Sequence, residues 1–207
     1  MTKRLNADIQ KPKIIESFYQ TILEEGFEGT SIAKIAARID MKPTLIIHYF
    51  GTKENLTIAG VDHVITIYSN LLDRLSPRHE DPEKRLMALL NTLWSRAYYE
   101  KFNIAVAFSV ISVSFRNTRI KKKIQILYQQ FKSRLIKELE ALHREGVIAC
   151  PDAVKTADVL ISMVEGSRHF RHFHVKAKDV AGYNQSMIMA ALSMLKTPLA
   201  HKQAEDV

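Results

Sequence analysis

The feature that most constrains the fold is a series of short amphipathic segments in residues 11–56, separated by residues that end or begin helices. In residues 11–25, large apolar side chains recur at four-residue steps along one helix face, at Ile14, Phe18 and Ile22. Gly26 ends this segment, and we expect Thr30 to cap a second helix that continues to Ile39. The pattern therefore predicts two consecutive short helices.

A tight turn and a third, shorter helix follow. Asp40 and Met41 form the turn, and Pro43 suits the first turn of the next helix. Gly51 ends that helix, and Thr52 can cap a fourth that starts one residue later. Two short helices joined by a tight turn, with another helix start close behind, are typical of a helix-turn-helix unit.

The third helix carries more apolar bulk than a core requires. At 100° per residue, Ile46 and Phe50 point together towards the first two helices. Leu45 and Ile47 instead lie on or beside the face that should meet solvent. Exposed apolar side chains on so short a helix usually have a partner. A plain three-helix core piece with a solvated rim is the alternative.

The DNA major groove is a partner that accounts for this face. Apolar groups can contact the thymine methyl, and Thr44 and His48 can hydrogen-bond to base edges or phosphates. Lys42 and Tyr49 are placed to reach phosphate oxygens. Lys53 stands at a helix N-terminus, where free backbone N–H groups favour an anion.

The rest of the chain also favours helices and shows no convincing sheet. Residues 103–115 would suit a buried strand as well, but no partner strand is evident, so we expect a buried helix. The expected helices after the turn unit span about 53–75, 82–101, 103–115, 118–145, 152–173 and 178–195. The sequence thus predicts an all-α protein of about nine helices.

Composition indicates a cytoplasmic protein without disulfides or membrane spans. The 207 residues include one cysteine, Cys150, and the N-terminus has no apolar region typical of a signal peptide. The net charge of +8 favours an anionic partner. Residues 1–56 contain eight Lys/Arg and seven Asp/Glu, so most of the excess lies later, in 116–123 and 168–178.

Residues 11–56 resemble the N-terminal DNA-binding domain of TetR-type (AcrR-like) transcriptional regulators. The matching stretches are GFEGTSIAKIA (26–36) and HYFGTKENL (48–56), with the short turn between them. IIHYFG (46–51) is most similar to the subgroup that includes choline-sensing repressors of glycine-betaine synthesis. Two positions depart from the family pattern. Asp40 replaces a glycine but tolerates a left-handed conformation, and Ile47 stands where tyrosine is frequent.

The resemblance implies two domains, a three-helix helix-turn-helix domain in residues 1–56 and a larger helical effector-binding and dimerisation domain in residues 57–207. It also implies the positions that contact double-stranded DNA, which are Thr30, Lys42, Pro43, Thr44, Leu45, Ile47, His48, Tyr49 and Lys53.

In the resembled family the larger domain encloses an effector pocket. We expect this pocket to involve Trp94, Tyr98, Phe102 and Glu165. The aromatic faces can hold a quaternary ammonium that a carboxylate balances. The same residues would equally line a pocket for a flat aromatic ligand.

The last two helices each carry one stripe of small and apolar residues, which predicts a four-helix homodimer interface. The stripes consist of Val159, Met163, Gly166 and Phe170 on the first helix and of Met187, Ala190, Ala191 and Met194 on the second.

No enzyme motif is present, and we expect neither cofactor nor metal. Glu165, His169 and His172 could share a helix face, but the interleaved arginines favour a cationic helix end over a metal site. The run 116–123 is interpreted as a solvated helix start, with an accessory phosphate contact as the alternative.

We therefore expect a homodimeric, ligand-responsive transcriptional repressor that binds a near-palindromic operator and is released by a small-molecule effector, with no membrane partner. The rivals are an all-α small-molecule-binding protein or enzyme with a structural helix-turn-helix, and a DNA-binding protein without an effector.

Overall fold

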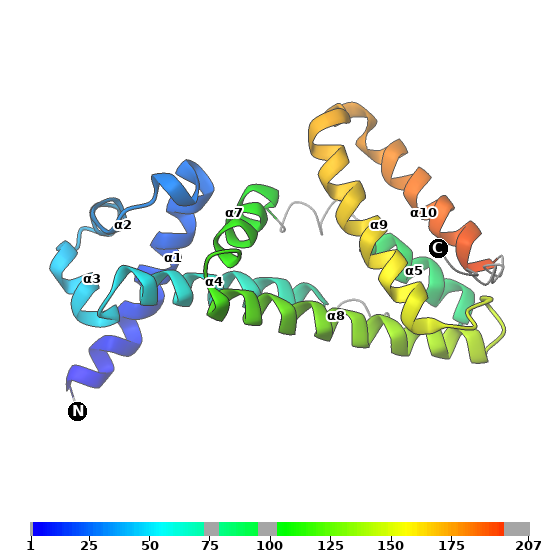
Figure 1. The fold of residues 1–207 in the computed structure, drawn as a ribbon, viewed down its shortest axis with the longest axis horizontal. Helices are drawn as coiled ribbons and strands as arrows, with labels where there is room; N and C mark the ends of the chain where they lie inside the picture. The colour runs from blue at the N-terminus through cyan, green and yellow to red at the C-terminus, as the bar shows by residue number, and fades with distance from the viewer. Residues whose placement is uncertain (1, 73–78, 95–102, 197–207) are drawn as a thin grey trace, which may run out of the picture. The chain divides into compact units, whose positions relative to one another are not determined.

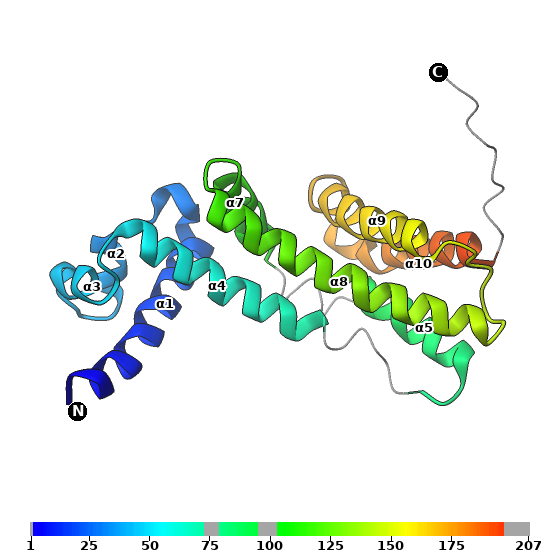
Figure 2. The same ribbon diagram turned by 60° about the horizontal axis from the view of Figure 1, so that its bottom comes forward.

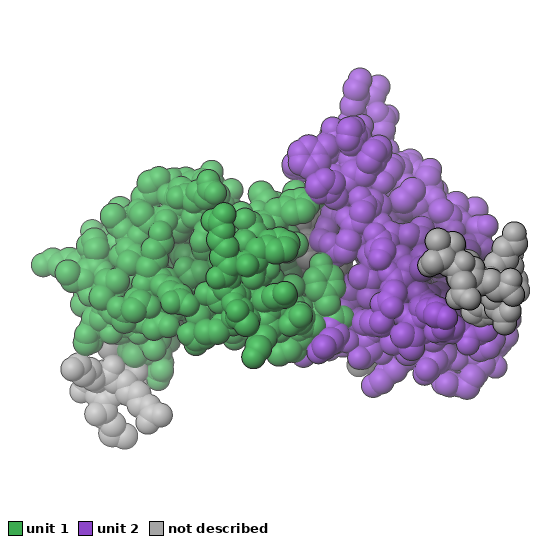
Figure 3. All heavy atoms as spheres, viewed as in Figure 1, with its two compact units in different colours: residues 1–70, 102–128 green, residues 71–101, 129–207 purple. Residues whose placement is uncertain are grey.

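The computed structural model describes residues 2–72, 79–94 and 103–196, and this part of the chain contains nine α-helices, one 3₁₀ helix and no strand. The all-α prediction is confirmed. Contacts divide the chain into two compact units (Figure 3). Unit 1 comprises Met1–Asn70 and Phe102–Tyr128, and unit 2 comprises Leu71–Lys101 and Gln129–Val207. The expected boundary at residue 56 falls inside unit 1.

Unit 1 is built on the expected helix-turn-helix. Its helices are α1 (Thr2–Gly29), α2 (Ile32–Arg38), α3 (Pro43–Phe50), most of α4 (Lys53–Leu72), α7 (Ile104–Ser114) and the first part of α8 (Thr118–Arg144) (Figures 1 and 2). The first three pack on one another through fully buried side chains, including Ile14, Ile35 and Ile46. The apolar periodicity of the sequence therefore identified this core.

Helix α1 begins nine residues before the expected start at Lys11. Residues 2–10 lack the apolar periodicity of the rest, and Pro12 lies inside the helix, so the sequence pattern favoured a later start. At its other end the helix is kinked at Gly26, which has φ 73° and ψ 175°. Only glycine adopts that conformation readily, so the predicted break lies where the sequence placed it.

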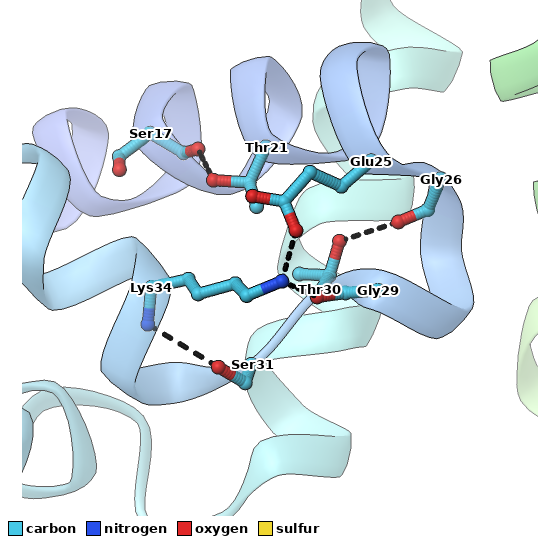
Figure 4. A network of polar contacts seen from close by, with 8 residues as sticks. All are labelled: Ser17, Thr21, Glu25, Gly26, Gly29, Thr30, Ser31 and Lys34. Atoms are coloured by element: carbon cyan, nitrogen blue, oxygen red, sulfur yellow. Dashed lines mark hydrogen bonds and ion pairs between the residues drawn. The ribbon is translucent and has the colours of Figure 1, made fainter.

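The link from α1 to α2 is held by a polar network (Figure 4). Ser31, and not Thr30 as expected, caps α2, because its side chain accepts a hydrogen bond from the Lys34 backbone N–H at 3.2 Å. The Thr30 hydroxyl turns back and donates to the Gly26 carbonyl at 2.7 Å. The Lys34 ammonium pairs with Glu25 and donates to the Gly29 carbonyl at 3.1 Å.

The turn between α2 and α3 has the backbone that the sequence suggested. Asp40 has φ 49° and is the one non-glycine residue with positive φ in the described part of the chain. Aspartate tolerates this conformation, so the turn survives without glycine. Gly51 ends α3 with φ 78°, and Thr52 accepts from the Asn55 backbone N–H at 3.1 Å, as expected for the cap of α4.

Helix α4 packs against α1 at a point where no side chain would fit. A Cβ atom at Gly60 would overlap the aromatic ring of Phe18, which is itself buried in the helix-turn-helix core. Such close approach requires glycine. Position 60 therefore fixes how α4 lies against α1.

Helix α7 confirms the helical interpretation of residues 103–115, which also suited a strand. Asn103 caps it by accepting from the backbone N–H groups of Ala105 and Val106. The expectation that it is buried was only partly correct. Val106 and Val110 are buried, but Phe108 is exposed, as is Phe115 beyond the end of the helix. No helix in the described residues is long and apolar enough to cross a bilayer.

Unit 2 contains α5 (Pro82–Leu93), the rest of α8, α9 (Ala153–His174), η2 (Ala177–Asp179) and α10 (Val180–Lys196) (Figures 1 and 2). Asp81 caps α5, as the Asp-Pro pair predicted. The expected continuation of this helix to Lys101 lies outside the described residues after Trp94. Leucines from α5, α8, α9 and α10 form the core, among them Leu86, Leu90, Leu139, Leu160 and Leu195.

Candidate nucleic-acid interface

The exposed face of α3 is apolar where a surface helix would ordinarily be polar. Leu45 and Ile47 are 42% and 40% exposed, whereas Ile46 between them is fully buried. Thr44 and His48 are also exposed on this helix, and Lys42 and Pro43 are exposed at its start. This surface combines apolar groups with hydrogen-bonding side chains on a short helix that can enter a major groove.

Two other expected DNA contacts, Lys53 and Thr30, lie in different surroundings. Lys53 is exposed at the first residue of α4, where its ammonium can approach a phosphate. Thr30 is only 3% exposed, and its hydroxyl is used by the Gly26 carbonyl. Thr30 therefore stabilises the link between α1 and α2 and presents no hydroxyl to a ligand. Its expected DNA contact is corrected accordingly.

A cavity of about 500 Å³ adjoins the exposed face of α3. Its walls are Gln10 and Lys13 of α1, the turn residues Ile39, Asp40, Met41 and Lys42, and Leu45 and Tyr49 of α3. Tyr49 is half-buried and its ring lies edge-on to His48, with centroids 5.6 Å apart. Lys13, Lys42 and Tyr49 thus line one cavity together with the Asp40 carboxylate, and ammonium groups and phenols are ordinary partners of phosphate oxygens.

Gln10 and Lys13 were not among the DNA contacts predicted from the sequence. They lie three residues apart on α1, so both can face the same side of the helix, and Lys13 directly precedes the buried Ile14. Because the first helix was expected to start at Lys11, Gln10 fell outside it and its three-residue spacing from Lys13 was not recognised. A helical interpretation of residues 2–10 would have revealed it.

In unit 2, the structure describes two of the four residues expected at an effector pocket. Trp94 is buried, and its indole N–H donates to the Ser167 hydroxyl at 2.9 Å. Glu165 forms an ion pair with Arg168, whose side chain is only 5% exposed. Tyr98 and Phe102 lie outside the described residues. Burial raises the pKa of Tyr183, whose hydroxyl donates to the Ser167 carbonyl at 3.3 Å.

The stripes expected at a dimer interface are mostly accessible. Val159, Gly166 and Phe170 are exposed on α9, and Ala190 is exposed on α10. Met163, Met187 and Met194 are half-buried. Ala191 is fully buried inside unit 2, so it is corrected from the partner face to the intrachain core. All five large apolar side chains that are exposed in the described part of unit 2 belong to α9 or α10 (Val154, Val159, Phe170, Phe173 and Met189).

The histidines at the end of α9 contact aromatic rings. The rings of Phe170 and His174 lie 4.5 Å apart, and those of His169 and Phe173 lie 5.1 Å apart. Within the described residues, no group of three or more His, Cys, Asp or Glu side chains could hold a metal ion.

Two family models match the chain. "Bacterial regulatory proteins, tetR family" matches residues 14–59, and "Tetracyclin repressor-like, C-terminal domain" matches residues 81–197, which is more than half of the chain. The chain belongs to the TetR family of transcriptional regulators. The helix-turn-helix is accordingly that of a DNA-binding regulator.

Individual relatives are distant. The HTH-type transcriptional regulator BetI of Brucella canis is 25% identical over 134 residues, covering 65% of this chain and 68% of its own. BetI of Burkholderia lata is 31% identical over 84 residues, covering 40% of this chain and 43% of its own.

Solved structures of transcriptional regulators share the fold of this chain. A regulator from Haloarcula marismortui matches with a TM-score of 0.77 at 20% identity, covering 91% of this chain and 99% of its own. A transcriptional regulator from Saccharomonospora viridis, solved in complex with choline, matches with a TM-score of 0.80 at 16% identity. The match covers 92% of this chain and 99% of that regulator. At these identities the likeness concerns the fold alone.

Proposed function

We propose that this TetR-family regulator is a ligand-responsive repressor that binds a near-palindromic operator as a homodimer. The observation that carries the proposal is the contrast on α3 between the buried Ile46 and its exposed neighbours Leu45 and Ile47. Two apolar side chains held towards solvent on the second helix of a helix-turn-helix fit base edges and thymine methyl groups.

The roles of the α3 surface separate into reading and anchoring. Thr44, Leu45, Ile47 and His48 face the bases, with Pro43 fixing the start of the helix. Lys42, Tyr49 and Lys53 contact phosphates, and the cavity beside α3 adds Lys13 and Gln10 of α1 to this group. Phosphate contacts set affinity and register, whereas base contacts set sequence preference.

A titration distinguishes specific from general DNA binding. Duplexes selected by the protein from a random pool supply the operator, and a shuffled duplex of equal composition is the control. The proposal expects affinity for the selected duplex to exceed that for the control by about 10³-fold or more at one salt concentration. Equal affinity for both duplexes would leave only a non-specific cation and would end the repressor proposal.

The homodimer is proposed to form through α9 and α10. Support comes from the confinement of the exposed large apolar side chains of unit 2 to these two helices, in the described residues. A two-fold pair presents two copies of α3, so half-sites one helical turn or a multiple apart follow.

The proposed effector region includes Trp94 and Glu165, together with Tyr98 and Phe102. The resemblance of residues 46–51 to choline-sensing repressors and the choline complex of the Saccharomonospora viridis regulator favour a choline-like cation. The ion pair between Glu165 and Arg168 opposes it, because that carboxylate already has a cationic partner. A neutral aromatic ligand is therefore retained as the second class.

Choline and its uncharged isostere 3,3-dimethyl-1-butanol separate the two classes. If a cation is sensed, choline releases the operator, the isostere does not, and Glu165→Gln reduces the response. If neither compound acts but a set of neutral aromatic compounds contains a releaser, the cation assignment is wrong. Trp94→Ala should weaken either response while operator affinity stays nearly unchanged.

A further inference from the structure

We propose that the turn between α7 and α8 is a reversible docking surface for an anionic phospholipid bilayer. Four basic residues form this surface, which we call the basic corner: Arg116, Arg119, Lys121 and Lys122. Phe115 lies directly before them. No membrane partner was expected from the sequence because it contains no membrane span, but an interfacial contact requires no span.

The basic corner carries charge that its surroundings do not neutralise. All four side chains are exposed, and none forms an ion pair with any residue that the structure describes. Arg116 lines a groove of about 690 Å³ whose other wall includes Glu25 and Glu28, yet pairs with neither. Like charges three residues apart on a helix, such as Arg119 and Lys122, repel. An anionic partner would remove this cost.

The same surface exposes apolar side chains. Phe115 is 83% exposed, more than any other large apolar residue in the described chain. Ile126 is 53% exposed and lies seven residues after Arg119, so it shares the helix face of Arg119 and Lys122. Basic side chains combined with a protruding aromatic ring are typical of a surface that rests in the headgroup region of a membrane.

The basic corner is held firmly on unit 1. Asn117 caps α8 by accepting from the Arg119 and Ile120 backbone N–H groups, and its amide donates to Glu54 of α4 at 3.1 Å. Ile120 is fully buried, and Lys123 pairs with Asp62 at 2.6 Å. The backbone therefore stays in place when the exposed side chains are changed, which allows them to be tested.

Phe115 decides between a bilayer and duplex DNA as the partner. Phosphates of either kind would neutralise the cations, but the phosphate backbone of a duplex offers no apolar place for an exposed phenyl ring. A bilayer interface accepts both groups. The basic corner also lies apart from α3 within unit 1 (Figures 1 and 2), so it is not part of the surface that reads bases.

Co-sedimentation of the full-length protein with vesicles tests the proposal. One vesicle set is phosphatidylcholine alone, and the other contains equal parts of phosphatidylglycerol. We expect binding only to the anionic set, with partitioning that falls as salt rises. Each basic residue near such a surface contributes about fivefold, so R116Q/R119Q/K121Q/K122Q should lower partitioning by roughly several hundredfold.

A matched variant controls for net charge. K84Q/K137Q/R144Q/K178Q removes four exposed basic residues of unit 2 and makes the same change in total charge. It should retain most of the vesicle binding. If it loses as much as the variant of the basic corner, binding reflects net charge, and the proposal is wrong. Thermal denaturation of each variant checks that the fold is intact.

Phe115→Ser separates the bilayer from DNA without changing charge. It should lower vesicle partitioning by about tenfold and leave affinity for a shuffled duplex unchanged. No binding to anionic vesicles overturns the proposal. The proposal is also overturned if Phe115→Ser leaves vesicle partitioning unchanged while R116Q/R119Q/K121Q/K122Q lowers affinity for the shuffled duplex. That result would assign the basic corner to DNA. Operator selectivity is measured separately, so neither outcome bears on the reading of bases by α3.

Discussion

At the scale of single residues, Ile46 and Ile47 are adjacent in α3 but should affect different properties. Ile46→Ala removes a fully buried side chain and should lower the free energy of unfolding by about 2–5 kcal/mol. Ile47→Ala removes an exposed one and should change stability by only about 0.5 kcal/mol. Urea denaturation of both variants measures the difference.

Substitutions of Ile46 and Ile47 should also differ in their effect on DNA sequence preference. Ile47→Ala should alter discrimination by roughly 1–3 kcal/mol at the base pair it contacts. Ile46→Ala should leave the order of preferred duplexes unchanged in whatever protein remains folded. Binding titrations against single-base variants of the selected duplex show this, and a shifted preference in Ile46→Ala would argue against its core assignment.

Lys13 should contribute to DNA affinity without contributing to sequence preference. If its ammonium contacts a phosphate, Lys13→Ala should weaken binding to all duplexes alike and reduce the slope of log affinity against log salt by about 0.9. Lys84→Ala is the control, because Lys84 is exposed in unit 2 and forms no ion pair with a described residue. Equal slopes for the two variants would remove Lys13 from the interface.

At the scale of helices, the cap of α9 should make stability depend on pH. The Lys155 backbone N–H donates to Asp152 Oδ1 at 3.0 Å and lowers the pKa of that carboxyl, and the Lys155 side chain adds to the effect. A lowered folded-state pKa stabilises the protein above the ordinary aspartate range near 4, and this contribution is lost as pH falls through the folded value.

Asp152→Asn tests the cap, because the amide can still accept a hydrogen bond but has no charge. The wild type should be more stable than the variant at pH 7, and the difference should shrink progressively as pH falls below about 4. Urea midpoints at several pH values provide the measurement. A stability difference that does not change with pH would show that the charge of Asp152 plays no part.

A side chain at position 60 should destabilise the protein. Gly60→Ala places a methyl group against the Phe18 ring, so we expect a loss of about 1–3 kcal/mol in unfolding free energy, although alanine favours helices more than glycine does. Gly166→Ala, with open space around its Cβ position, is the control and should be neutral or stabilising in the protomer. Equal effects would mean that α4 and α1 can move apart easily.

The helices and the exposed face of α3 could be predicted because both follow from local spacing. Features that depend on tertiary contacts could not. The Thr30 hydroxyl bends back because the kink at Gly26 brings a free carbonyl to it. Ala191 lies 40° around α10 from Met187, enough to turn it into unit 2. Gln10 and Lys13 become candidate DNA contacts only because the fold places α3 beside them.

At the scale of the whole molecule, an isologous dimer through α9 and α10 makes a further prediction. Phe170→Asp places a charge on the proposed interface and should raise the dimer dissociation constant by at least about 100-fold, since a buried unpaired charge is costly. Operator affinity should fall with it, because a monomer reaches only one half-site. Sedimentation at several concentrations measures the first effect.

Val154→Asp is the matched control for the dimer. Val154 is exposed on the same helix but on a different side from the Val159 stripe. The Val154→Asp variant should remain dimeric. If both variants dissociate equally, the interface is wider than the stripe, and if neither does, the dimer forms elsewhere.

Trp94 is the one tryptophan of the chain, and it is buried in unit 2 with its indole N–H bonded to Ser167. Protein fluorescence excited at the red edge of tryptophan absorption therefore comes from Trp94 alone and reports on unit 2. A red shift of that emission reports opening around α9, whereas unit 1 contributes no tryptophan signal. Comparison with helix content from circular dichroism would reveal whether the two units melt together or in sequence, without any attached dye.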